Sequence, residues 1–508
     1  MTTSNLYLLL GGGLFLVALT GVLTLLWGPT AQQATYLGLL LVFTALVVGL
    51  AVRRWLHGQF DWFEPGLFMS VAYLLLFGYA GLRFVADPSE LHPFLQGDQG
   101  WLTRALFFVL LGIVAYWAGY YGRWGLALHK LTHHPGREWL RSHASIRRGM
   151  VAGVYLVGLA SRLLMVRQGL FGYLKSPDSY VNVPYAEFLV RLEAFCGYGL
   201  VLAWLDWYSH PQSQARRLFA ISLLGSEMFW GFFSGMKMNV ILPLLFVAMI
   251  YTYKRGRLPM RYVAVALAIA ILIYPVNTLY RSMVSTGVLE IRGPMDMISS
   301  SPVLVDELLF QFDDPGLYWE SGYDSALRRA SMIQNCALLL KYLDQTGAYW
   351  HGRYIWMLPA LILVPRAVWP EKPVSNLGYW FAVNVWGQDP HLQSSTAVTF
   401  PGDLYLQFGL PSLLVGMFLT GIVLRWLYER YGRPRSDYSL FIYIFVFYQL
   451  VAHEPDVVLK VANSLRVFLI VLAVSLLVFR LPRRVAAVVA PSGSEPRYTP
   501  ALAGSQPA

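Results

Sequence analysis

The stretch LVPRAVWPEKP, residues 363–373, places two cations, Arg366 and Lys372, among three prolines and beside Trp369. Each proline fixes its own φ and restricts the residue before it, so the stretch predicts a stiff, non-helical ribbon whose cations point in defined directions. Such an arrangement is typical of an anion site. A basic loop lying against lipid headgroups would have the same composition, and the stretch alone leaves both interpretations open.

Four more cations lie in or at the edge of apolar segments, where exposure to lipid would be costly. Lys237 follows GFFSG, Arg281 ends an apolar run, and Arg466 lies near the start of another. None of these three has an acid at helical spacing, which favours a polar cavity. Arg191 has Glu187 four residues before it, so an intrahelical ion pair explains it equally well. Lys237, Arg281 and Arg466, together with the two cations of the ribbon, predict a site for a multiply charged anion such as a diphosphate.

Few residues in the same part of the chain could accept a proton. Asp403, in FPGDLYLQFG, opens an apolar run close to the predicted anion site, and a position at a helix N-terminus explains it equally well. His453 and Glu454, in HEPDVVLK, are the other predicted catalytic bases, although His453 also fits a plain helix end. No GxxxxGK[ST], HExxH, GxSxG or outward DxD pattern is present, so we expect neither a cofactor nor a metal ion.

The composition indicates which elements hold these residues. Hydrophobic residues make up 56% of the 508 and charged residues only 13%, and apolar runs near the length of a membrane span recur along the chain. This pattern predicts an all-α polytopic membrane protein with about twelve transmembrane helices. The two cysteines have neither a disulfide nor a metal spacing, and we expect the first run to be retained as a helix. The expected spans are 6–27, 33–52, 62–84, 102–121, 149–166, 186–207, 218–235, 238–253, 260–280, 402–424, 437–452 and 463–480.

The distribution of basic residues predicts the orientation. Lys and Arg concentrate in the connections near 53–54, 123–148, 216–217, 254–261 and 425–435 and after 480, which share one side of the membrane if both termini are cytoplasmic. The positive-inside rule makes that side the cytoplasm. The net charge of +11 then lies in loops that flank the membrane, so we expect no nucleic-acid partner.

Residues 1–484 are expected to form a single membrane domain, and residues 485–508 a disordered cytoplasmic tail. The connection 281–401 is far longer than the others, and a loop of such length is functional or disordered. We expect it on the extracytoplasmic side, partly helical, with one helix ending near Gly347 and an interfacial segment at 354–364 that is too short to span. The helical spacing is carried by Leu327, Ala330, Ile333, Ala337 and Leu340.

The chain contains, in this order, the segments FFSGMKMNVILPLLFVAMIYTYKRGRLP, NTLYRS, LVPRAVWPEKP and TAVTFPGDLYLQFGLPSLLVGMFLTGIV. Together they resemble the oligosaccharide repeat-unit polymerases, the O-antigen polymerase (Wzy-like) group of bacterial envelope proteins. The resemblance covers residues 230–425, and the rest of the chain is similar only in topology. The paired Arg-x10-Gly motifs of some members cannot be placed, because Gly378 falls twelve residues after Arg366.

The resemblance implies a lipid-linked glycosyltransferase of GT-C-like class in the bacterial inner membrane, active on its periplasmic face. In such an enzyme a hydroxyl of one undecaprenyl-diphosphate-linked oligosaccharide attacks the reducing-end sugar of another, and the lipid diphosphate leaves. Fixed cations stabilise that leaving group, so no metal ion is required. Membrane lipid and a chain-length regulator are further partners that the resemblance suggests. The substrate-binding residues would be Arg366, Lys372, Arg281, Lys237, Arg466, Arg191, Tyr405 and Trp369.

Two other functions stay open. An O-antigen ligase, which moves a finished glycan to another acceptor, needs the same cations and differs only in that acceptor. A transporter or flippase of polysaccharide lipids is favoured by the number of helices. Against transport, no two matching six-helix halves are visible, and the connection RRWLHGQFDW lacks the Gly-Asp-Arg pattern of the major facilitators.

Overall fold

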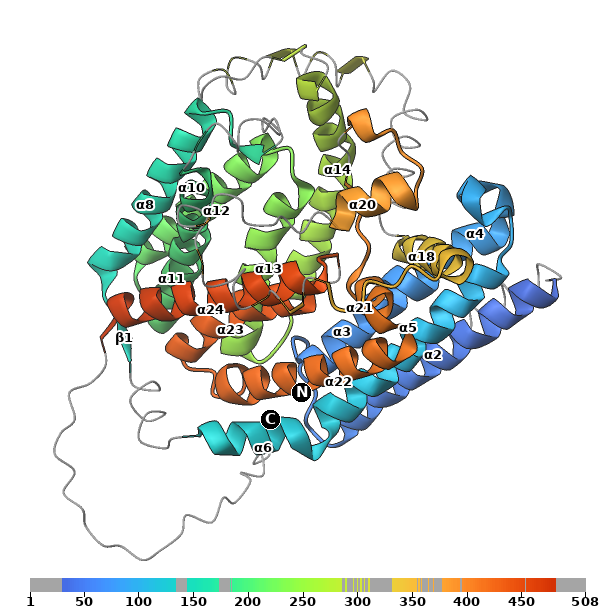
Figure 1. Cartoon of the computed structure of the whole chain (residues 1–508). Coiled ribbons are helices and arrows are strands. Elements are labelled where there is room, and N and C mark those ends of the chain that lie inside the picture. Colours follow the sequence, from blue (N-terminus) through green and yellow to red (C-terminus); the bar gives the residue numbers. More distant parts are fainter. Residues whose placement is uncertain are drawn as a thin grey trace, which may run out of the picture.

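The computed structural model describes residues 30–133, 144–172, 185–285, 331–353, 377–392, 395–452 and 454–480, with scattered single positions between 183 and 369. Within these ranges the chain is almost entirely helical (Figure 1), and its only strands are β1 (Ser145–Ile146) and β2 (Phe479–Arg480), which pair antiparallel. The predicted all-α class is therefore confirmed. The expected span 6–27 and the expected tail 485–508 lie outside the described residues.

Seven helical segments of the described chain are long and apolar enough to cross a membrane, which is the pattern of a polytopic membrane protein. A total of twelve spans remains a prediction. The seven segments are Ala31–Leu56, Pro65–Ala86, Gly100–Tyr121, Arg148–Arg167, Ala186–Ser209, Leu410–Gly432 and Val457–Val478.

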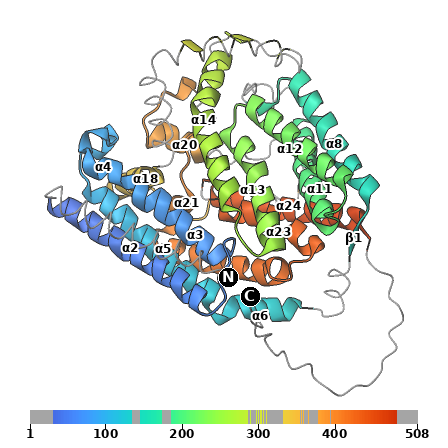
Figure 2. The same ribbon diagram turned by 180° about the vertical axis from the view of Figure 1, so that it is seen from behind.

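One group of helices combines the beginning of the described chain with later segments (Figures 1 and 2). Its early members are α2 (Ala31–Leu56), α3 (Pro65–Tyr73), the π-helix η1 (Leu74–Gly78), the 3-10 turn η2 (Tyr79–Gly81), α4 (Leu82–Ala86), the turns η3 (Pro88–Glu90) and η4 (Pro93–Leu95), α5 (Gly100–Tyr121) and α6 (Arg123–Thr132). Two later helices, α18 (Met332–Thr346) and α22 (Leu410–Leu427), pack on α5.

A second group consists of helices that follow one another in the sequence, and in it neighbours along the chain are neighbours in space. Its members are α8 (Arg148–Arg167), α10 (Ala186–Glu193), α11 (Phe195–Ser209), α12 (Gln214–Phe233), α13 (Lys237–Arg255) and α14 (Met260–Ser285). The helices α23 (Asp437–Val451) and α24 (Val457–Val478) connect the two groups, because α23 contacts α3 and α13 while α24 contacts α8. The remaining elements are α20 (Leu377–Asn384), η6 (Pro390–Leu392), α21 (Phe400–Phe408) and the π-helix η7 (Tyr428–Gly432).

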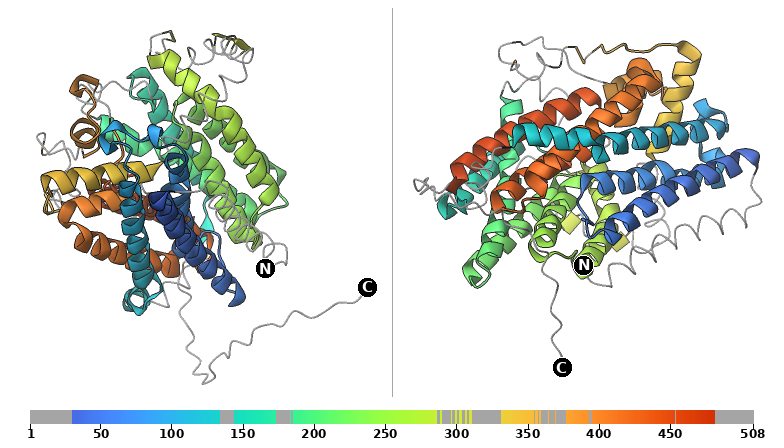
Figure 3. Two further views of the ribbon diagram at one scale, coloured as in Figure 1. Left: turned by 90° about the vertical axis from the view of Figure 1, so that its right-hand side faces the viewer. Right: turned by 90° about the horizontal axis from the view of Figure 1, so that it is seen from below.

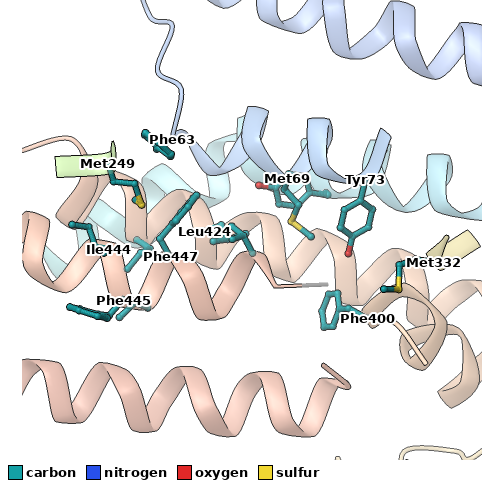
Figure 4. Packing of buried hydrophobic residues seen from close by; sticks show 14 of the residues in the cluster. Phe63, Met69, Tyr73, Met249, Met332, Phe400, Leu424, Ile444, Phe445 and Phe447 are labelled. Atoms are coloured by element: carbon teal, nitrogen blue, oxygen red, sulfur yellow. The ribbon is translucent and has the colours of Figure 1, made fainter. Parts of the chain in front are cut away.

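The core between the groups is built from large apolar side chains (Figure 4). Phe63 comes from the loop before α3, Met69 from α3, Leu424 from α22, and Ile444 and Phe447 from α23, and all five are buried. Between apolar helices, close packing of this kind supplies much of the association energy. The core thereby fixes α23 against both groups.

The prediction of one continuous span at 402–424 is wrong. The segment consists of α21 and α22, separated at Gly409, which has φ 72° and ψ −146°. Only glycine adopts this conformation without strain, so the helix cannot continue through it. Consequently α21 is a short helix of its own, outside the spanning segment that begins at Leu410.

The helix expected within the long connection is confirmed where the structure describes it. α18 ends at Thr346, and Gly347 follows in the left-handed conformation that commonly terminates a helix. Nearly all of α18 from Met332 to Leu343 is buried against α5, η1 and α21, so this part of the connection is integrated into the core. The expected positions Leu327 and Ala330 and most of 354–364 lie outside the described residues.

The helices α2 and α22 both pack along α5 (Figure 3), and we name two faces of the molecule after the elements at the two ends of this group. The α21 face carries α18, α21 and the start of α2, where Gln32 donates to Asp98 just before α5. The α6 face carries α6, β1 and β2 and the end of α2, where Arg54 pairs with Glu64. The basic connections predicted to be cytoplasmic, as far as they are described, lie on the α6 face.

Candidate functional site

A cavity of about 180 Å³ lies among α8, the end of α10, α11, α12, α13, α23 and α24. We call it the Arg162 cavity. Arg162 lies in the second half of α8, and α8 begins beside β1 on the α6 face, so the cavity lies in the half of the molecule nearer the α21 face.

Three charged side chains form one cluster at the cavity. The guanidinium of Arg162 donates two hydrogen bonds to Glu227, from Nη1 to Oε1 at 2.8 Å and from Nη2 to Oε2 at 3.0 Å. Its Nε donates to Glu193 Oε1 at 3.1 Å. The hydroxyl of Tyr155 donates to Glu227 Oε1 at 3.0 Å. The side chains of Arg162 and Glu227 are 7% and 8% exposed, so this pair is desolvated and held in a fixed geometry.

The cluster is not itself an anion site. Two carboxylates face one guanidinium, so it carries a net negative charge, and the donors of Arg162 are directed at both acids. Glu193 differs from Glu227 because its side chain is 24% exposed and its contacts with described residues all involve Oε1. As far as the described residues show, Oε2 is left for a hydroxyl group. A partly solvated carboxylate beside a cavity can accept a proton, which is the property of a general base.

The rest of the lining is aromatic and amide-bearing. Trp230, Tyr198 and Tyr448 supply aromatic rings, and Asn239 and Gln449 supply amide groups. Aromatic faces pack against apolar C–H surfaces, and amides and carboxylates bond hydroxyl groups in defined directions. A sugar ring presents both kinds of surface. The lining therefore suits a saccharide better than a purely apolar ligand.

Two of the predicted cations lie beside this cavity. Arg466 precedes the lining residue Val467 on α24 and is close enough to Arg191 and Glu187 for their charges to interact. Arg191 also interacts electrostatically with Tyr198, which lines the cavity. The structure thus brings together two cations that are distant in sequence. Glu187 also lies close enough to Arg466 for their charges to interact, while the predicted intrahelical pair of Glu187 with Arg191 stays a prediction.

Two further predicted cations flank the same region. Lys237 begins α13, two residues before the lining residue Asn239. Arg281 lies one turn before the end of α14, directly after Tyr280, whose hydroxyl donates to the carbonyl oxygen of Phe233 at 3.0 Å. Both side chains are partly buried.

The ribbon cations Arg366 and Lys372 and the predicted base His453 lie outside the described residues. Trp369 is described and partly buried. Their roles in substrate binding and catalysis therefore remain predictions.

Asp403 is placed differently from the cations. It lies on α21, 1% exposed, where Oδ2 accepts the N–H of Val457 at 2.7 Å and Oδ1 accepts Gln407 Nε2 at 2.5 Å. It thus ties α21 to the first turn of α24. Val467 lies ten residues further along α24, which corresponds to a distance of about 15 Å from the cavity. This geometry favours the helix-terminus role for Asp403, at a helix other than its own.

Tyr405 and Glu454 have different neighbours. Tyr405, also on α21, stacks on Phe108 with ring centroids 5.2 Å apart and faces the first group of helices, away from the Arg162 cavity. Glu454 is exposed in the turn between α23 and α24 and interacts electrostatically with Tyr448, a residue of the cavity lining. Of the predicted catalytic residues that are described, Glu454 is therefore the one nearest the cavity.

Burial raises the pKa of Asp403 to about 7, from 3.8 in the unfolded chain. The folded protein then binds this proton more tightly than the unfolded chain. Protonated Asp403 therefore contributes to the free energy of unfolding. This contribution, about 4 kcal/mol, is fully present below about pH 4 and is lost as pH rises towards 7. We expect Asp403→Asn to remove this pH dependence, since an amide has no proton to lose and still accepts the Val457 N–H. We expect Asp403→Ala to cost about 1–3 kcal/mol, because it leaves that N–H unsatisfied.

The free energy of unfolding of the detergent-solubilised protein, measured between pH 4.5 and 8 for each variant, tests both effects. An asparagine variant with the same pH dependence as the unmodified protein would contradict this role for Asp403.

The sequence interpretation did not include Glu193 or Glu227 among the functional residues. The available signal was an ionisable residue inside an apolar helix, which marks Glu227 as clearly as Arg162. The two residues are 65 positions apart, so their pairing could not be read from helical spacing.

A protein-family model described as "Domain of unknown function (DUF8712)" matches residues 192–451, just over half of the chain. The match includes Glu193, Glu227 and every aromatic and amide residue named above for the cavity. Arg162 precedes the matched range. No curated protein and no solved structure matches the chain.

Proposed function

The chain belongs to the DUF8712 family, and we propose that it polymerises oligosaccharide repeat units carried on undecaprenyl diphosphate. The description of the family names no activity. The proposal is supported by the resemblance of residues 230–425 to the O-antigen polymerases and by one structural observation. That observation is the Arg162 cavity, in which a partly exposed carboxylate, aromatic rings and amides occur together near two cations.

The reaction joins two lipid-linked glycans. A hydroxyl oxygen of the acceptor forms a bond to the anomeric carbon of the donor, and the bond from that carbon to the diphosphate oxygen breaks. The hydroxyl proton passes to a base, and undecaprenyl diphosphate leaves as the anion. The protein must therefore supply a proton acceptor and positive charge at the leaving group.

We assign the proton acceptor to Glu193. Its Oε2 is available, and Arg162 fixes the orientation of its carboxylate through Oε1. Arg162 and Glu227 are then positioning residues, whose bidentate pair holds the guanidinium in place. Glu454 is the alternative acceptor, through its proximity to Tyr448.

The diphosphate would bind at the cations rather than at the charged cluster. Arg191 and Arg466 lie together beside the cavity, and Lys237 begins a helix that lines it. The ribbon cations Arg366 and Lys372 would complete this set. Arginine offers two parallel donors to a phosphate group and lysine a point charge.

The proposed orientation places the α21 face in the periplasm and the α6 face in the cytoplasm of a bacterial inner membrane. Its support is the concentration of basic connections on the α6 face, as the positive-inside rule requires. Lipid-linked glycans are a suitable donor on the periplasmic side, where nucleotide sugars are absent.

Purified protein incubated with a synthetic undecaprenyl-diphosphate repeat unit tests the function. We expect a ladder of products that differ by one repeat unit. A single transfer to a foreign acceptor would instead identify a ligase. Lipid movement across proteoliposomes without any new glycosidic bond would identify a transporter.

Replacement of the ribbon cations is a separate prediction. We expect Arg366→Ala and Lys372→Ala each to reduce polymer formation about a hundredfold or more, because each removes a contact that strengthens as charge develops on the leaving diphosphate. Arg366→Lys should restore activity only in part, because an ammonium lacks the bidentate fork. Polymer formation is measured at matched protein levels in the membrane. Normal polymer from both alanine variants would mean that the ribbon only anchors the loop to lipid.

A further inference from the structure

A second cavity, of about 380 Å³, lies on the α6 face, at the other end of the helices from the Arg162 cavity. We call it the Arg425 pocket. The end of α2, the loop before α3, α6, the end of α22 and η7 form its walls. Its charged lining residues are Arg54, Arg425, Arg433, Arg435, Asp61 and Glu429.

Part of this lining is a preorganised frame. Arg54 donates twice to the buried Glu64, from Nε to Oε2 at 3.0 Å and from Nη2 to Oε1 at 2.7 Å. Arg425 lies between two acids, with Nη2 2.6 Å from Glu429 Oε1 and Nη1 3.7 Å from Glu64 Oε1. These contacts fix the positions of both guanidinium groups before any ligand binds.

Two other arginines, Arg433 and Arg435, each have a single ion-pair contact among the described residues and are more exposed. The side chain of Arg433 is 62% exposed and donates through Nη1 to Glu429 Oε2 at 2.9 Å. The side chain of Arg435 is 51% exposed, and its Nη2 lies 3.8 Å from Asp61 Oδ2. A guanidinium has five N–H donors, so these single contacts leave donors on both side chains for a ligand.

The balance of charge favours an anion. Four guanidinium groups face two lining carboxylates, and the buried Glu64 behind them still leaves an excess of positive charge. Paired arginines bind phosphate oxygens in bidentate geometry. An anion that bears phosphate therefore fits the lining better than a cation or a neutral ligand.

The backbone of the pocket is also unusual. η7 is a π-helix, a rare form that is frequent at functional sites. Arg435 has φ 54°, which is uncommon for a residue other than glycine, Asn or Asp. These two features bring Arg433 and Arg435 to the same pocket as Arg425.

The helix α6 adjoins the pocket through Leu126. Trp124 and Leu131 of this helix are exposed, and it also carries Arg123 and Lys130. Exposed apolar and basic side chains on a short amphipathic helix are typical of an element that lies in the membrane interface. A ligand could therefore come from the lipid headgroup layer or from the aqueous phase.

We propose that the Arg425 pocket binds a phosphate-bearing anion, held by Arg433 and Arg435 in front of the frame of Arg54 and Arg425. Its source is either a soluble phosphate compound or the headgroup of an anionic lipid. The site lies on the face opposite to the proposed glycosyl transfer and does not depend on that proposal.

The test uses the full-length protein in nanodiscs. In discs of phosphatidylcholine, titration with inorganic pyrophosphate measures binding of a soluble anion. In discs with increasing phosphatidylglycerol, native mass spectrometry counts retained lipids. The double variant Arg433→Gln/Arg435→Gln removes the exposed donors. The double variant Arg53→Gln/Arg257→Gln is the matched control, because it removes the same charge from exposed positions of the same face outside the pocket.

We expect saturable binding of at least one probe by the unmodified protein, weakened about tenfold or more in the pocket variant and unchanged in the control. Binding of pyrophosphate identifies a soluble ligand, and retention of phosphatidylglycerol alone identifies a lipid headgroup. Equal weakening in both double variants, or no saturable binding of either probe, would overturn the proposal. Thermal unfolding of each variant checks folding, and the single substitutions Arg433→Gln and Arg435→Gln replace the double variant if it unfolds.

Discussion

Glu193→Gln is expected to slow polymer formation by about 10²- to 10⁴-fold while the protein stays folded. Glutamine keeps an oxygen that can accept the hydrogen bond from Arg162 Nε, so the cluster should retain its geometry. It cannot accept the proton of the attacking hydroxyl. The measurement is the initial rate of ladder formation from a lipid-linked repeat unit, at equal amounts of purified protein.

The matched control for this variant is Glu90→Gln. Glu90 is a partly exposed acid that pairs with Arg83 near the start of α5, remote in sequence from the Arg162 cavity. We expect its removal to leave the rate unchanged. If Glu193→Gln has the normal rate and Glu454→Gln or Asp403→Asn is inactive, Glu193 is not the catalytic base. The base is then one of the residues predicted from the sequence.

Arg162→Ala is expected to have the largest effect on stability. It leaves Glu227 buried without its bidentate partner and Glu193 without its Nε contact. Breaking a buried ion pair by removal of one member costs about 3–5 kcal/mol. We expect low yield and a lower midpoint of thermal unfolding in detergent.

The double variant Arg162→Met/Glu227→Met separates the cost of an unpaired charge from the value of the pair. Because both charges are removed and volume is kept, we expect it to recover most of the stability lost by Arg162→Ala. It should remain inactive, since Glu193 is no longer oriented. A double variant as unstable as Arg162→Ala would show that packing, rather than charge, determines the effect.

Local sequence patterns predicted the helical class well, because an apolar run of sufficient length can satisfy its backbone in a membrane only as a helix. They also predicted the end of α18 at Gly347, because a single glycine is enough to adopt the left-handed conformation that terminates a helix. The division at Gly409 was also visible in the sequence. Pro411 follows two residues later, at the first turn of α22, a position that proline favours.

The candidate site was predictable only in part. Arg191 and Arg466 were both predicted as substrate-binding residues, and the structure places them close enough for their charges to interact. The partners of Arg162 were not predictable, because Glu193 and Glu227 lie on other helices and only tertiary packing selects them. Asp403 was ambiguous for a related reason: the helix whose N-terminus it caps begins 54 residues later.

Photo-crosslinking tests most directly whether the glycan binds in the Arg162 cavity. The probe is an undecaprenyl-diphosphate repeat unit that carries a diazirine on its sugar, added to the purified protein and mapped by mass spectrometry after proteolysis. Our account predicts labelled peptides that contain Tyr198, Trp230 or Gln449, and loss of this labelling with excess unmodified substrate. Labelling confined to peptides of α21 or of the α6 face, with none at these three residues, would contradict it.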